Sequence, residues 1–76
     1  MVTIEFALIL PARTYAQTDI LWTVSRPPSG MIHFVCSIGS DYRLARINTS
    51  GGISFNSNLT LSSTAYMIGN LTYPFS

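Results

Sequence analysis

Short apolar segments separated by turn residues constrain the fold of this chain more than any other feature. The segments recur at intervals of about ten residues and are interrupted by Gly, Pro and Ser, which favour turns. Several of them alternate apolar and polar side chains, as half-buried strands do, and helix signals are nearly absent. The sequence therefore predicts an all-β fold, a small antiparallel sandwich or open barrel. Strands are expected at 1–10, 19–24, 31–38, 42–47, 53–62 and 64–68, followed by a tail at 69–76.

The clearest alternation occupies residues 53–62 and follows the loop 48–52, in which Gly51 and Gly52 can take positive φ without steric cost. Its polar positions are all uncharged, so the pattern predicts one half-buried strand with a neutral polar outer face. Segment 31–38 is largely apolar on both faces, which predicts a central strand. The core is expected to contain Ile53, Phe55, Leu59 and Leu61 together with Trp22 and Phe34.

The length of 76 residues predicts a single domain, 1–76, in which residues 1–18 are an apolar segment and a connector. The apolar run contains Glu5 and ends at Pro11, well short of the roughly 20 apolar residues that a membrane-spanning helix needs. We therefore expect no transmembrane span. Small residues follow the run, but no Lys or Arg precedes it, so this segment is expected to be either a packing strand or a degenerate secretory signal.

Charge is scarce and unevenly distributed along the chain. Charged residues make up 9% of the sequence, against about 25% in ordinary soluble domains, and the formal net charge is +1. Residues 47–76 contain no ionisable side chain except the Tyr phenols. Neutral apolar strands pair with other strands unless something covers them. We therefore expect this half to contact a protein partner or another copy of the chain, or to be covered by glycans. Candidate interface residues are Leu61, Tyr66 and Ile68.

Basic residues are too few to predict nucleic-acid binding, which requires clustered Lys and Arg. The chain has four Arg and no Lys, and only Arg43 and Arg46 lie close together in sequence. We expect one of these two arginines to form an ion pair with Asp41.

The sequence contains no arrangement that is typical of a catalytic, cofactor-binding or metal site. Cys36 is the single cysteine, so no internal disulfide can form. His33 is the nearest candidate base, but on a strand the two side chains point to opposite faces. Cys36 is therefore predicted to be a buried structural residue, and the chain is predicted not to be an enzyme.

Three Asn-x-Ser/Thr triplets begin at Asn48, Asn58 and Asn70. Each is a possible glycosylation acceptor in a secreted protein. This interpretation predicts a secreted or extracellular location. The alternative is that these residues serve only turns and strand edges.

Two stretches resemble a known family. "RINTSGGISFNSN" followed by "LTL" and "SSTAYM", and upstream "RPPSGMIHFVCSIGSDY", resemble parts of an immunoglobulin heavy-chain variable domain. The resemblance places Cys36 at the first core cysteine and implies a truncated immunoglobulin-like module. The chain departs from the family because Trp22 precedes the cysteine and a second cysteine is missing.

The opening "TIEFALILP" is similar to the start of the membrane segment in Tad-type pilus assembly proteins. Those proteins continue with a long apolar run, whereas here Pro11 interrupts it.

Together these features predict a non-enzymatic binding or structural β module that works outside the cell or within a larger assembly. One alternative is a truncated or non-standard reading-frame product with no independent function. Another is a structural subunit of the pilus or virion type.

Overall fold

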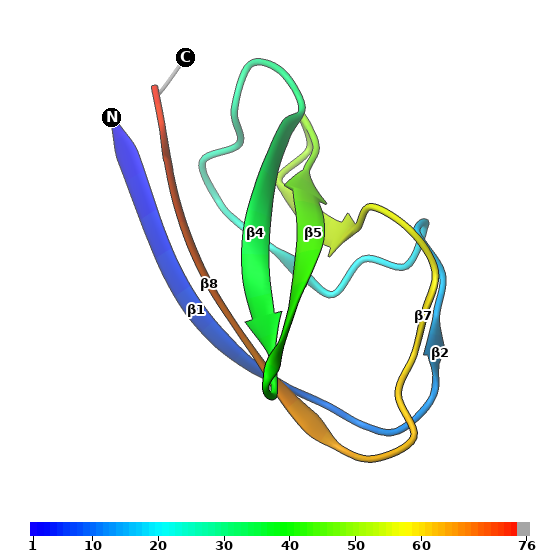
Figure 1. Cartoon of the computed structure of the whole chain (residues 1–76). Helices are drawn as coiled ribbons and strands as arrows, with labels where there is room; N and C mark the ends of the chain where they lie inside the picture. Colours follow the sequence, from blue (N-terminus) through cyan, green and yellow to red (C-terminus); the bar gives the residue numbers. More distant parts are fainter. Residues whose placement is uncertain (75–76) are drawn as a thin grey trace.

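The computed structural model describes residues 1–74, which form eight β-strands and no helix (Figure 1). The all-β fold class predicted from the alternating segments is confirmed. The strands are β1 (Val2–Leu10), β2 (Thr14–Tyr15), β3 (Trp22–Thr23), β4 (Ile32–Ile38), β5 (Asp41–Ile47), β6 (Gly52–Phe55), β7 (Leu59–Thr60) and β8 (Ala65–Tyr73).

Six strands form one antiparallel sheet in the order β1-β8-β4-β5-β6-β3, and β2 pairs with β7 in a second, two-stranded sheet. The large sheet curls into a half-barrel (Figure 1), in agreement with the expected small sandwich or open barrel. Its longest ladder joins segments far apart in sequence, because β1 pairs with β8 from Val2–Tyr73 to Leu10–Ala65. The two ends of the described chain therefore lie side by side.

The inner face of the curled sheet carries the hydrophobic core. Alternate residues of β1 are buried there, whereas Thr3 and Glu5 between them are exposed, as the period of a strand requires. The small sheet packs against this face, and the rings of Tyr15 and Phe55 meet edge to face with centroids 6.1 Å apart. The buried apolar residues include Ile4, Phe6, Leu10, Phe34, Cys36, Ile38, Ala45, Ile47, Ile53, Phe55, Leu59, Met67, Leu71 and Tyr73.

Strand β4 is central, between β8 and β5, as its apolar pattern predicts. Glycines allow the two tight connections on either side of β5. Gly39 follows β4 with φ of 59°, and Gly51 precedes β6 with φ of 86°. Gly52 is needed for space instead, because a Cβ there would lie 2.9 Å from Cδ1 of Ile20.

The prediction of one continuous strand over residues 53–62 is wrong. The first part is β6 in the large sheet, and the second part contains β7 in the small sheet. The chain changes sheets at residues 56–58, where the Asn58 carboxamide oxygen accepts a hydrogen bond of 3.0 Å from the Gln17 N–H. Ile53, Phe55 and Leu59 are buried as expected and Leu61 is partly buried, but Ser54, expected on the polar outer face, is buried as well.

Trp22 lies at the margin of the core. The predicted strand 19–24 shrinks to β3 because Ala16 and Asp19 form a turn, in which the Asp19 carboxylate accepts a 2.9 Å hydrogen bond from the Ala16 N–H. Strand β3 is also the last strand of the sheet, and the Trp22 side chain is left 39% exposed. The expectation that Trp22 faces the core holds only in part, through a contact between its ring and that of Phe6.

Strand β8 extends to Tyr73, so most of the segment predicted to be a tail belongs to the sheet; Phe75 and Ser76 lie outside the described residues. Leu71 and Tyr73 are buried on the inner face. Gly69 leaves room for the Phe6 ring of β1, because a Cβ at position 69 would lie 2.7 Å from Cζ of Phe6.

Candidate functional site

Cys36 and His33 lie on opposite faces of β4, as the strand period predicts. Cys36 is 2% exposed on the inner face, and its thiol donates a 3.5 Å hydrogen bond to the Arg43 carbonyl. Burial raises the pKa of this thiol, which disfavours the reactive thiolate. His33 is exposed on the outer face, with Nε2 3.1 Å from Oδ1 of Asn56. The two residues therefore do not form a nucleophile–base pair.

Arg46 ties the large sheet to the connector before β3. Its Nε donates to Oγ of Ser54 at 3.3 Å, and a terminal nitrogen donates to the Gln17 carbonyl at 3.0 Å. The expected ion pair between Asp41 and Arg43 or Arg46 is not found within residues 1–74. Asp41 and Arg46 lie at opposite ends of β5, which separates their charged groups.

The ion pair found in the described part of the chain joins Arg13 to Asp19 at 3.5 Å, and both side chains are substantially exposed. Arg13 also lies 4.4 Å above the centre of the Tyr15 ring. Within residues 1–74, no three His, Cys, Asp or Glu side chains are grouped so that they could hold a metal ion. Arg13 and Asp19 thus serve local structure at the connector.

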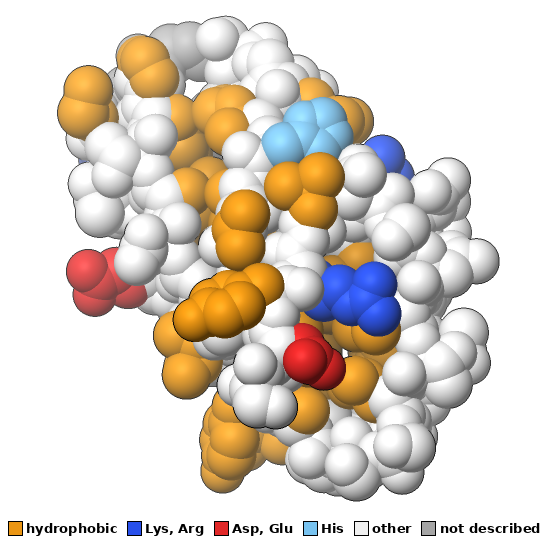
Figure 2. Space-filling view, viewed as in Figure 1, with side chains coloured by type: hydrophobic (Ala, Val, Ile, Leu, Met, Phe, Trp, Pro, Cys, Tyr) orange, Lys and Arg blue, Asp and Glu red, His pale blue; other side chains and the backbone are white. Residues whose placement is uncertain are grey.

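Exposed apolar side chains gather on the outer face of the large sheet. Tyr66 and Ile68 of β8 lie opposite Ile9 and Ala7 of β1. On the other side of β8, Ile68 is opposite Ser37 of β4, and β4 in turn presents Val35 beside Leu44 of β5. Figure 2 shows hydrophobic side chains over β4 and β5, with basic and acidic groups and the histidine beside them. We call the exposed apolar members the outer-face cluster: Ile9, Val35, Tyr42, Leu44, Tyr66 and Ile68.

The structure brings together two of the three interface residues predicted from the sequence. Tyr66 and Ile68 are 60% and 55% exposed within the outer-face cluster. Leu61 is elsewhere: it follows β7, packs partly buried against the core, and donates its N–H to the Arg13 carbonyl. The cluster residues of β4 and β5 were missed because they lie outside the uncharged half, and only the strand order shows that β4 and β5 follow β8 in the sheet.

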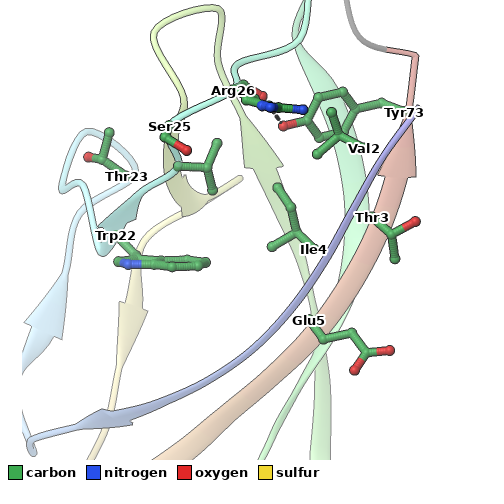
Figure 3. Close-up of a pocket in the computed structure, with 10 residues that line it drawn as sticks. Val2, Thr3, Ile4, Glu5, Trp22, Thr23, Ser25, Arg26 and Tyr73 are labelled. Atoms are coloured by element: carbon green, nitrogen blue, oxygen red, sulfur yellow. Dashed lines mark hydrogen bonds between the residues drawn. The ribbon is translucent and has the colours of Figure 1, made fainter.

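A cleft of about 450 Å³ lies between β1 and the segment from Trp22 to Arg26. The Trp22 ring and Ile4 face this cleft, whereas the Glu5 carboxylate points away from it (Figure 3). At its upper end the Tyr73 hydroxyl donates a hydrogen bond to the Arg26 carbonyl. The cleft separates the two edge strands of the half-barrel, and its walls are part apolar and part polar.

The three candidate glycosylation residues differ in environment. Oδ1 of Asn48 accepts hydrogen bonds of 2.9 Å from the N–H groups of Ser50 and Gly52, which shapes the loop before β6. Asn58 and Asn70 are exposed, and Asn70 lies two residues from Ile68 on the same face of β8.

A comparison with models of known protein families gives no match, and neither do comparisons with curated proteins and with solved structures. The resemblance to an immunoglobulin variable domain therefore remains an expectation. The described residues include no helix long and apolar enough to cross a membrane.

Proposed function

We propose that this chain is a non-enzymatic structural module that works outside the cell or in an assembly, and that it binds further copies of itself through the outer-face cluster. The observation that supports this most is that exposed apolar side chains occupy the same face of four neighbouring strands, β1, β8, β4 and β5. Contiguous exposed apolar patches on soluble domains commonly mark protein interfaces. Two of its members are tyrosines, which are enriched at interface centres.

Charge supports copies of the same chain as the partner. The net charge is only +1, so copies do not repel one another strongly. The charged side chains that share the outer face with the cluster include Glu5 on β1 and Arg46 on β5, which are of opposite sign. Burying Tyr66 and Ile68 against their counterparts would remove apolar surface from water, which is the main driving force of such contacts.

The test is a charge placed in the cluster. Ile68→Lys should lower the mass seen by light scattering after size-exclusion chromatography, because burying a lysine in an apolar contact is costly. Thr72→Lys is the matched control, since Thr72 is exposed on the same strand and face but outside the cluster. A wild-type chain that stays monomeric at millimolar concentration, or an equal effect of both substitutions, would rule out this contact.

A further inference from the structure

Strand β1 forms an open edge of the large sheet. It is the first strand in the sheet order, so it pairs on one side only, with β8. Its ladder with β8 runs through nine consecutive residue pairs, from Val2–Tyr73 to Leu10–Ala65, with no bulge. It is thus a long, regular edge.

The hydrogen bonds of β8 show which backbone groups of β1 point outward. Gly39 donates its N–H to the Tyr66 carbonyl, so Tyr66 directs its backbone groups toward β4. Backbone direction alternates along an antiparallel strand, so Met67 and every second residue after it face β1. Their partners are the even-numbered residues of β1. The outward N–H and C=O groups therefore belong to Thr3, Glu5, Ala7 and Ile9.

This edge has little of the protection that natural sheets give to open edges. Natural edges carry Lys, Pro, bulges or inward-pointing charges. Within β1 the single charge is Glu5, and Pro11 lies one residue past its end. Four outward-facing residues in a row are thus available to another strand.

We propose that β1 pairs antiparallel with β1 of a second copy of the chain, about a two-fold axis that passes beside Phe6. The sheet then continues from one copy into the other. This edge contact goes beyond the face contact proposed above, because it is made by backbone hydrogen bonds of β1 and shares only Ile9 with the outer-face cluster.

The register follows from length and charge. Residues opposite one another in an antiparallel pair face the same way, so a symmetric pair must centre on one residue of β1. Centring on Phe6 overlaps the whole strand and uses all four outward-facing residues. Centring on Glu5 would place two carboxylates directly opposite each other, which is destabilising. Centring on Ala7 shortens the overlap and leaves Thr3 unpaired.

The side chains of β1 fit a copy of themselves in this register. On the outer face, Glu5 lies opposite Ala7 and Thr3 lies opposite Ile9, so the 63% exposed Ile9 gains a neighbour. On the inner face every pair is apolar: Val2 with Leu10, Ile4 with Leu8, and Phe6 with its counterpart. Val2 and Leu8 are only partly buried in one copy, and this pairing would complete their burial. This self-complementarity favours a second copy as the occupant.

A proline on the edge tests the proposal. Ala7→Pro removes an outward N–H at the middle of the ladder but none of the hydrogen bonds to β8, and prolines are tolerated at such positions. Ala7→Thr is the control, because it keeps the N–H. Sedimentation equilibrium of the full chain should show a dimer whose Kd rises at least about tenfold in Ala7→Pro and changes little in Ala7→Thr. Circular dichroism checks that both variants keep the strand spectrum.

The two proposed contacts can fail separately. A dimer that survives Ala7→Pro but is lost in Ile68→Lys would overturn the edge contact and support the face contact. A dimer lost in Ala7→Pro but kept in Ile68→Lys would support the edge contact and overturn the face contact. A chain that is monomeric throughout would overturn both.

Disulfide trapping tests the register without proline. In a Cys36→Ser background, single-cysteine variants Thr3→Cys and Ile9→Cys place one thiol each on the edge. The expected register puts position 3 of one copy opposite position 9 of the other, at a Cα separation of about 5.5 Å, which a disulfide can span. Under mild oxidation, a mixture of the two variants should form the crosslinked dimer rapidly and each variant alone only slowly. Equal rates in the mixture and in the separate samples would overturn the register.

Discussion

The rings of Phe6 and Trp22 meet with centroids 5.8 Å apart and an interplanar angle of 46°. Phe6 belongs to β1 and Trp22 to β3, which are the two ends of the six-stranded sheet. Phe6 also meets Phe34 of the central strand edge to face, at 6.0 Å. The curl of the sheet is thus held by aromatic contacts between its first strand, its middle and its last strand.

Replacing Phe6 should therefore both destabilise the fold and change the surroundings of the single tryptophan. Phe6→Ala is expected to lower the free energy of unfolding by about 3–5 kcal/mol, since the side chain is buried. It should also shift the native fluorescence of Trp22 to longer wavelength, because water replaces the ring. Met31→Ala, at a site 51% exposed and outside the outer-face cluster, should cost less than about 0.5 kcal/mol and leave the fluorescence unchanged. Urea denaturation followed by fluorescence measures both, and similar losses in the two variants would contradict the proposed role of Phe6.

Neighbouring residues at the end of β6 should respond very differently to substitution. Phe55 is 2% exposed and packs against the Tyr15 ring, so Phe55→Ala should cost about 3–5 kcal/mol. Asn56 is at the surface and its side chain contacts His33, so Asn56→Ser should cost less than about 1 kcal/mol. Thermal unfolding of the two variants distinguishes them. Equal losses would show that Phe55 is not a core residue.

Strands whose burial depends on one local period could be predicted from the sequence. In β1 every even-numbered residue is apolar, and this segment is correctly predicted to be a strand. In β4 both faces are largely apolar, and this strand is correctly predicted to lie at the centre of a sheet. The hairpin loop at Gly51 was also predictable, because its positive φ requires a residue without a Cβ.

The failures have a common cause, which is that tertiary contacts decide where a strand ends. The alternation in residues 53–62 is interrupted only at Ser57, and the chain leaves the large sheet there, where a hydrogen bond between Asn58 and Gln17 holds the bend. Ser54 was expected on a solvated polar face. It is 3% exposed instead, because the Arg46 side chain, which donates a hydrogen bond to its hydroxyl, lies over it.

The outer-face cluster could be predicted only for its members in the uncharged segment 47–76. Tyr66 and Ile68 could be proposed because no charged side chain lies near them in sequence. Val35 and Leu44 lie among His33, Arg43 and other polar residues in sequence, and only the sheet register places them opposite each other, on the two strands that follow β8 in the sheet. Local composition cannot supply that register.

The Cys36 thiol should make stability depend on pH in the alkaline range. Burial raises its pKa above the ordinary value of 9.0, so the unfolded chain ionises first as the pH rises. The contribution of Cys36 to the free energy of unfolding is therefore full below about pH 9 and is lost as the pH rises through the folded-state pKa.

Unfolding free energies at about pH 7 and about pH 9.5 should differ more in the wild type than in Cys36→Ser. Cys36→Ser itself should be modestly less stable at neutral pH, and fast alkylation of the native wild type would contradict a buried thiol.

Two glycines with positive φ offer a matched pair for the loops that frame β5. Gly39 has φ of 59° and open space around it, so Gly39→Ala should cost only the backbone strain, about 1 kcal/mol. Gly51 has φ of 86°, and a Cβ there would lie 2.5 Å from the Val24 carbonyl oxygen. The Gly51 carbonyl also accepts a hydrogen bond of 2.9 Å from the Val24 N–H, which holds the segment after β3 in place. A Cβ at position 51 would push Val24 away and weaken this hydrogen bond. Gly51→Ala should therefore cost at least about 1–2 kcal/mol more than Gly39→Ala, and it should expose Trp22, seen as a red shift in native fluorescence. If the two variants unfold at the same urea concentration with unchanged fluorescence, the close approach of Gly51 to Val24 is not part of the native fold.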